Sequence, residues 1–281
     1  MTENKIEYIC NILKSKYPQH SCEFHKLALA REILIFFFGL EWTNQAIHYQ
    51  HPNKPTKTEE ARGYLKSYDH GYQWQELIFK LAERVYNLQN VTGISRIIRD
   101  IKQGNLTSRY AELEAAKHLY GRRIAFDFVK PHGLKGSDFD IKIKDEIEVN
   151  CEVKHKIDST KLSEATLLDT LNQAKTQVPG GEPSLLFIKI SEIWVENSSI
   201  ESVIINATNS FFKSNDKTLG IMFRWMQIDT SHEGRFFWIC KFIKNNHLIG
   251  GIDCDNFIKK LQSEITNWIS LETLINKYII D

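Results

Sequence analysis

The stretch from residue 136 to 156, GSDFDIKIKDEIEVNCEVKHK, constrains the fold more than any other part of the chain. Apolar and polar residues alternate in two runs, and the acidic pair Asp145 and Glu146 separates them. Period-two alternation is typical of strands that turn one face to a core, and a short polar interval favours a turn between them. The sequence therefore predicts a β-hairpin with Phe139 and Ile141 on its core face.

The charged side chains of this hairpin are predicted to share the opposite face. Asp138, Glu152 and Lys154 fall on that face, and Asp140 lies on it as a second candidate for the aspartate. Magnesium prefers carboxylate, carbonyl and water oxygens, so two carboxylates and the backbone carbonyl of Val153 make a candidate site. An ammonium group beside such a site can hold an attacking water or a developing negative charge. This is the chemistry that phosphodiester hydrolysis needs.

The elements around the hairpin predict an α/β fold. From residue 107 onward, the apolar periodicities and the Gly and Pro breaks predict the order α-β-β-β-α-β-α-β-β-α, in which helices flank a mixed sheet. The elements are a helix at 109–121, a strand at 123–131, the hairpin, a helix at 163–177, a strand at 184–190, a helix at 200–212, a strand pair at 219–228 and 235–243, and a helix from 257.

The first part of the chain reads differently. Apolar residues recur at helical spacing over residues 1–105, which predicts an all-helical N-terminal region followed by an α/β domain at 106–281. The composition, 42% hydrophobic and 25% charged over 281 residues, is that of an ordinary globular protein. Five unpatterned cysteines, the absence of a signal peptide and the lack of an uninterrupted apolar span predict a cytoplasmic protein with reduced thiols and no membrane association.

The pattern Asp-x(13)-Glu-Val-Lys, formed by Asp138, Glu152 and Lys154, resembles the PD-(D/E)XK nuclease superfamily, which has the restriction-endonuclease-like fold. The resemblance covers residues 107–195 and departs from the family pattern at Ser137, where a proline is common. It implies a glutamate on the preceding helix and a glutamine after the lysine. The candidates are Glu112, with Glu114 as the alternative, and Gln177, with Gln173 as the alternative.

This resemblance implies a Mg²⁺-dependent nuclease that accepts Mn²⁺ and acts on DNA. Asp138, Glu152 and the Val153 carbonyl would bind the metal, Lys154 would position water, and Glu112 would assist. Because a fold does not fix an activity, two alternatives stay open. One is a catalytically inactive nuclease-fold module that binds nucleic acid or a protein partner. The other is an interaction protein whose helical half is the working surface.

Charge gives a weaker indication of the partner. The formal net charge is only +1, but residues 91–123 carry seven basic residues against three acidic ones. Such a segment can contact backbone phosphates, or it can be a solvated helix face. The sequence does not choose between DNA and RNA, and it does not fix an oligomeric state.

Overall fold

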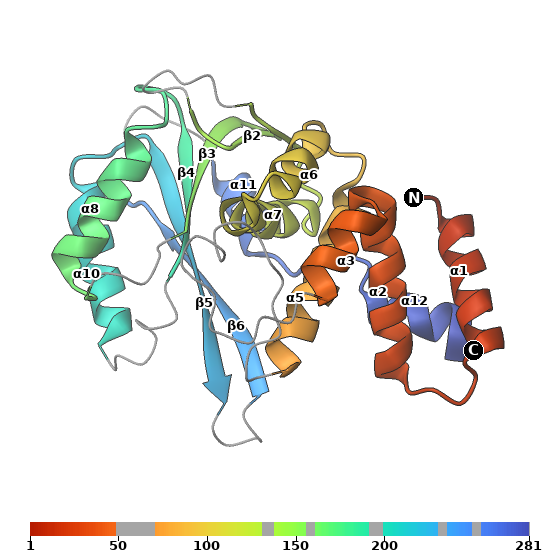
Figure 1. The fold of residues 1–281 in the computed structure, drawn as a ribbon. Coiled ribbons are helices and arrows are strands. Elements are labelled where there is room, and N and C mark those ends of the chain that lie inside the picture. Colours follow the sequence, from red (N-terminus) through yellow and green to blue (C-terminus); the bar gives the residue numbers. More distant parts are fainter. Residues whose placement is uncertain are drawn as a thin grey trace. The chain divides into compact units, whose positions relative to one another are not determined.

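The computed structural model describes residues 1–48, 71–130, 138–155, 161–190, 199–229, 235–248 and 254–280. It is an α/β structure in which a series of helices precedes a six-stranded mixed sheet (Figure 1). The chain forms two compact units, one of residues 1–117 with 266–281 and one of residues 118–265. The α/β class, the N-terminal helices and the mixed sheet are as the sequence predicted. The predicted division lay at 105/106, whereas the first unit extends to residue 117 and also includes residues 266–281.

The first unit is helical. Its elements are α1 (Glu3–Lys16), α2 (Cys22–Phe38), α3 (Leu40–His48), α5 (Gly71–Leu88), α6 (Ile94–Lys102), most of α7 (Leu106–Tyr120), α12 (Leu271–Ile275) and the π-helix η1 (Asn276–Ile280).

Helix α2 contains the most apolar run of the sequence. It begins where the Ser21 side chain accepts a hydrogen bond from the Phe24 amide, and it ends at Gly39, whose φ of 88° interrupts the helical backbone. Its residues Leu29, Ile33 and others are fully buried in the unit. Within the described ranges, no helix combines the length and the apolar character that a membrane span needs.

Helix α5 binds the returning C-terminal segment. The Glu83 carboxylate accepts hydrogen bonds from the Leu271 amide at 2.9 Å and the Trp268 indole at 3.3 Å. Asn87 accepts from the Ile269 amide and donates to the Ile269 carbonyl, at 2.9 and 2.8 Å. These contacts join residues more than 180 positions apart, and they explain why residues 266–281 belong to the first unit.

The second unit carries the sheet, with its strands in sequence order (Figure 1). The strands are β1 (Phe126–Phe128), β2 (Ile141–Lys144), β3 (Glu148–His155), β4 (Ser184–Lys189), β5 (Thr218–Asp229) and β6 (Arg235–Lys244), and the helices are α8 (Glu164–Lys175), α10 (Ile200–Phe212) and α11 (Asp255–Gln262). Strands β3, β4 and β5 are parallel, and the other neighbouring pairs are antiparallel. Among the elements that the structure describes, the order from α7 to α11 is the predicted one.

Helices α8 and α10 cover one face of this sheet (Figure 1). Leu171 and Phe211 from these helices pack in one cluster with Leu186, Ile188 and Phe223 from the strands. Strand β4 is buried over almost its whole length, as its continuous apolar run predicted. Register places Leu186 beside Glu152, so Glu152 lies on the face that α8 and α10 cover.

Candidate active site on the β2–β3 hairpin

The predicted hairpin is present. Strands β2 and β3 pair antiparallel, with Ile141 opposite Cys151 and Ile143 opposite Val149. The turn falls after Lys144, as predicted, and Lys260 of α11 binds the Asp145 carboxylate with its ammonium at 2.7 Å. Strand β2, however, begins only at Ile141.

The alternation of the sequence breaks at Asp140. The Asp140 amide donates to the Cys151 carbonyl at 3.1 Å, although Ile141 is the strand partner of Cys151. Asp140 and Ile141 on one strand therefore both lie opposite Cys151 on the other, which is the arrangement of a β-bulge. Phe139 accordingly packs against the cluster that contains Leu186, on the face opposite Ile141. The prediction that Phe139 shares a core face with Ile141 was wrong because a single extra residue reverses the period-two pattern.

Lys154 contacts two other predicted site residues, Glu152 and Gln177. Its Nζ lies 2.7 Å from the Glu152 Oε1 and donates a hydrogen bond to the Gln177 Oε1, also at 2.7 Å. Glu152 is only 1% exposed, so its carboxylate depends on this ammonium for a counter-charge. Gln177 follows the last turn of α8, whereas the alternative Gln173 binds Asp169 on the exposed side of that helix.

Both candidate aspartates form hydrogen bonds near Glu152 and Lys154. The Asp138 amide donates to the Gln177 carbonyl at 3.1 Å, and the Asp140 Oδ2 accepts from the Val153 amide at 3.0 Å. The N–H and C=O of one strand residue point toward the same neighbouring strand, so the Val153 carbonyl faces the edge where Asp140 lies. The main chain of Asp138 is thus hydrogen-bonded to Gln177, whose side chain binds Lys154, and Asp140 binds the amide of Val153, the residue between Glu152 and Lys154.

Two neighbouring titratable groups are uncharged at neutral pH. Burial raises the pKa of the Cys151 thiol well above its usual value, and the negative charges of Asp140 and Glu152 raise it further. Burial, helped by the charge of Lys189, lowers the pKa of His155 from 6.5 to about 3. The charges in this part of the sheet therefore come from its carboxylates and lysines.

Glu112 occupies a different compact unit from the other five predicted residues. It lies on α7 in the first unit and is 2% exposed. The Arg96 Nη2 lies 3.2 Å from its Oε2, and the Arg109 guanidinium donates to its Oε1. Arg109 also lies 3.0 Å from Asp100 through its Nε. The carboxylate of Glu112 is therefore part of an internal ion-pair network of the helical unit.

The alternative, Glu114, has a similar environment. It forms an ion pair with Arg84, and both side chains are almost completely buried. The Arg84 guanidinium also lies over the Tyr110 ring, 4.7 Å from its centroid. Since Arg96 and Arg109 are committed to Glu112, the excess of basic residues at 91–123 is partly internal. Arg96 and Arg109 are thus less available for phosphate contact than the sequence alone allowed.

Sequence reasoning missed a second polar group on the hairpin. The Lys142 ammonium contacts Glu148 at 3.0 Å and the Asn150 Oδ1 at 3.1 Å, and the Asn150 amide group donates to Glu182 at 2.6 Å. Lys142 and Asn150 are cross-strand partners, and Asn150 lies two residues before Glu152, so they share its face. The polar positions of the two alternating runs, which include Lys142, Glu148 and Asn150, are the sequence feature that could have predicted this cluster.

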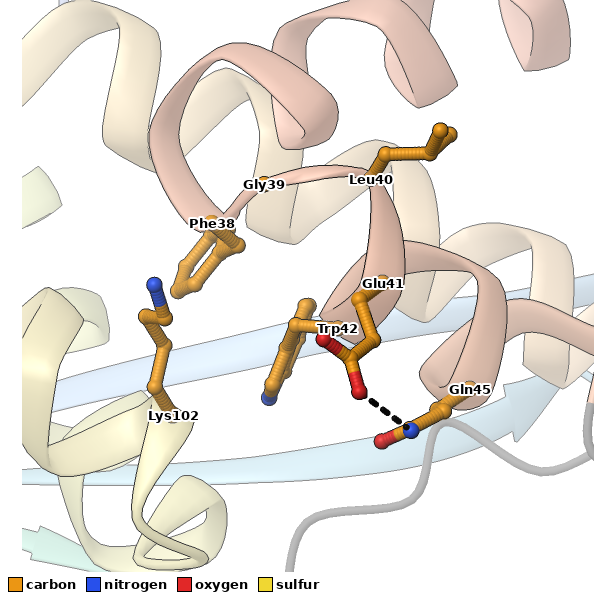
Figure 2. A pocket seen from close by; sticks show the side chains of 7 residues that line it. All are labelled: Phe38, Gly39, Leu40, Glu41, Trp42, Gln45 and Lys102. Carbon is orange, nitrogen blue, oxygen red and sulfur yellow. Dashed lines mark hydrogen bonds between the residues drawn. The ribbon is translucent and has the colours of Figure 1, made fainter.

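The first unit contains a separate pocket of about 360 Å³ at the α2–α3 junction (Figure 2). Trp42 stacks on Phe38 with ring centroids 4.4 Å apart, and Lys102 extends toward Phe38. The pocket contains none of the six predicted site residues. Its lining consists of Phe38, Gly39, Leu40, Glu41, Trp42, Gln45 and Lys102.

The donor set of the hairpin consists of oxygen ligands, which suits a hard divalent cation. Among the residues that the structure describes, no three His, Cys, Asp or Glu side chains converge as a ready metal cluster. A site here would therefore combine two carboxylates with the Val153 carbonyl and water, as magnesium sites do. No known family, no curated protein and no solved structure matches this chain.

Proposed function

We propose that this chain is a metal-dependent phosphodiesterase that cleaves nucleic acid, with DNA as the first substrate to test. The observation that carries the proposal is the placement of Lys154 between Glu152 and Gln177, with both contacts at 2.7 Å. An ammonium fixed from two sides beside a buried carboxylate is ordered before substrate arrives. Such pre-ordered charge is what stabilises a transition state effectively.

A divalent cation bound here would neutralise charge at the phosphate and promote ionisation of a water. Glu152 would bind it with Asp138, and the Val153 carbonyl would supply a further oxygen. Lys154 would hold the attacking water or the charge that develops on the phosphate oxygens. Gln177 would keep the Lys154 side chain extended, because its amide oxygen accepts one of the three ammonium hydrogens.

The direct test is incubation of the full chain with labelled single- and double-stranded DNA and RNA, in Mg²⁺, Mn²⁺ or EDTA. We expect cleavage with either metal and none in EDTA. Substitutions Glu152→Gln and Lys154→Met should each slow cleavage by roughly a hundredfold or more, the usual effect of removing a charge-stabilising group. Asp138→Ala should do the same, because Asp138 is the proposed metal-binding aspartate.

Lys142→Met is a matched control. Lys142 lies on the same hairpin, and its side chain is 22% exposed against 27% for Lys154. It contacts Glu148 and Asn150. Its loss should leave the rate within about threefold of the wild type. Equal losses for Lys142→Met and Lys154→Met would contradict the assignment.

A second candidate is a nuclease-fold module without activity. The internal network of Glu112 favours it, because that glutamate already neutralises two arginines of the helical unit. Calorimetry with Mg²⁺ and Mn²⁺ separates the two candidates. Metal binding that disappears in Glu152→Gln supports the enzyme, and nucleic-acid binding without any metal binding supports the module.

A further inference from the structure

One backbone group at the end of the hairpin has an unusual partner. The Val153 amide is part of β3 and Val153 is 8% exposed, so its N–H needs an acceptor within the protein. In a continued antiparallel ladder, a backbone carbonyl of the β2 chain would accept it. The bulge at Asp140 ends that ladder, and the Asp140 Oδ2 accepts instead, at 3.0 Å.

This hydrogen bond acts on the peptide that joins Glu152 to Val153. Fixing that peptide fixes the direction in which the Glu152 side chain leaves the strand, and Lys154 follows two residues later. The Asp140 amide also donates to the Cys151 carbonyl, so Asp140 holds β3 through both its main chain and its side chain. The Asp138 amide binds the Gln177 carbonyl and fixes the other end of the same segment.

We infer that Asp140 is a positioning residue, a clamp on the Val153 amide that sets the geometry of Glu152 and Lys154. The inference rests on the proposed function for its catalytic consequence. The clamp requires an oxygen acceptor at this position, and it does not require a negative charge. This separates it from a role as metal ligand, in which the negative charge of the carboxylate strengthens binding of the cation.

Two substitutions distinguish these roles in the full chain. Asp140→Asn keeps a side-chain oxygen that can accept the Val153 N–H, and we expect its kcat and its Mg²⁺ requirement to stay within about threefold of the wild type. Asp140→Ala removes the acceptor, and we expect kcat to fall at least about tenfold with KM nearly unchanged, because small misplacements of reacting groups are costly. If the alanine variant does not fold, Asp140→Ser, whose oxygen stands closer to the backbone, replaces it.

Asp145→Ala is the matched control. Asp145 is a partly buried aspartate at the opposite end of the same hairpin, where it pairs with Lys260. Its removal should lower stability and leave kcat unchanged. A loss of kcat in Asp145→Ala equal to that in Asp140→Ala would show that any damage to the hairpin suffices and would overturn the inference.

Amide hydrogen exchange at Val153 gives a readout that does not depend on activity. Exchange should accelerate in Asp140→Ala and stay slow in Asp140→Asn. The inference is overturned if Asp140→Ala retains the wild-type kcat and exchange rate. It is also overturned if Asp140→Asn is as slow as the alanine variant and needs more Mg²⁺, since the charge is then what matters. If the wild-type chain cleaves nothing, the proposed function fails, and exchange alone decides the clamp.

Discussion

Substitution Glu112→Gln tests whether the Glu112 network stabilises the helical unit. The side chains of Glu112 and Arg96 are only 3% and 9% exposed, and the Arg96 Nη2 lies 3.2 Å from the Glu112 Oε2. Removing one partner of a buried ion pair typically costs about 3–5 kcal/mol, because the remaining charge is left in a poorly solvated site. Glutamine keeps a neutral acceptor, and both arginines keep Asp100 as a shared partner, Arg96 at 3.4 Å and Arg109 at 3.0 Å, so the loss should lie at the low end of this range. We therefore expect a loss of about 3 kcal/mol in the free energy of unfolding.

The measurement is urea unfolding followed by circular dichroism and by tryptophan fluorescence. Glu23→Gln is the matched control, because Glu23 pairs with Lys26 at 2.9 Å in the same unit but is 61% exposed. Exposed pairs contribute about 0–1 kcal/mol, so this variant should unfold almost as the wild type does.

A double-mutant cycle with Arg96→Met isolates the pair. The effects of Glu112→Gln and Arg96→Met should fall short of additivity by more than about 1 kcal/mol, because each substitution breaks the same contact. The network argument would be refuted by a Glu112→Gln variant as stable as Glu23→Gln. If that stable variant also lost cleavage, the role that the nuclease resemblance implies for Glu112 would be the better explanation.

Three further outcomes follow from the structure. Burial lowers the pKa of Lys117 from 10.5 to about 8, so the unfolded chain binds more protons between these values and stability should rise with pH across that window. Lys117→Met should therefore unfold less readily than the wild type below pH 8, by no more than about 3 kcal/mol, with the difference vanishing toward pH 10.5 in pH-dependent urea titrations. Gly220→Ala should destabilise the chain by about 1–3 kcal/mol in thermal unfolding, because a Cβ there would meet the Phe242 ring at 2.4 Å. Glu83→Ala should raise protease cleavage near Trp268, since two donors of the C-terminal segment lose their acceptor; unchanged cleavage would contradict the docking role of Glu83.

The sequence by itself determined most of the second unit. Alternation predicted the hairpin, a continuous apolar run predicted the buried strand β4, and breaks at Gly and Pro separated the elements in the correct order. The same alternation placed Glu152 and Lys154 on one face, which the structure shows in contact, whereas Gln177, which also contacts Lys154, came from the family resemblance. These features are predictable because side chains two residues apart on a strand share a face whatever the rest of the chain does.

Only the tertiary structure decided the surroundings of Asp140 and Glu112. The bulge at Asp140 depends on how β2 meets β3, and it moved Phe139 to the face opposite Ile141. The family resemblance suggested Glu112 as a site residue, but the structure pairs its carboxylate with Arg109 and with Arg96, which lies 16 residues earlier. Periodicity cannot register such contacts, because they depend on which elements meet in space. For the same reason, the return of residues 266–281 to α5 left no local signal in the sequence.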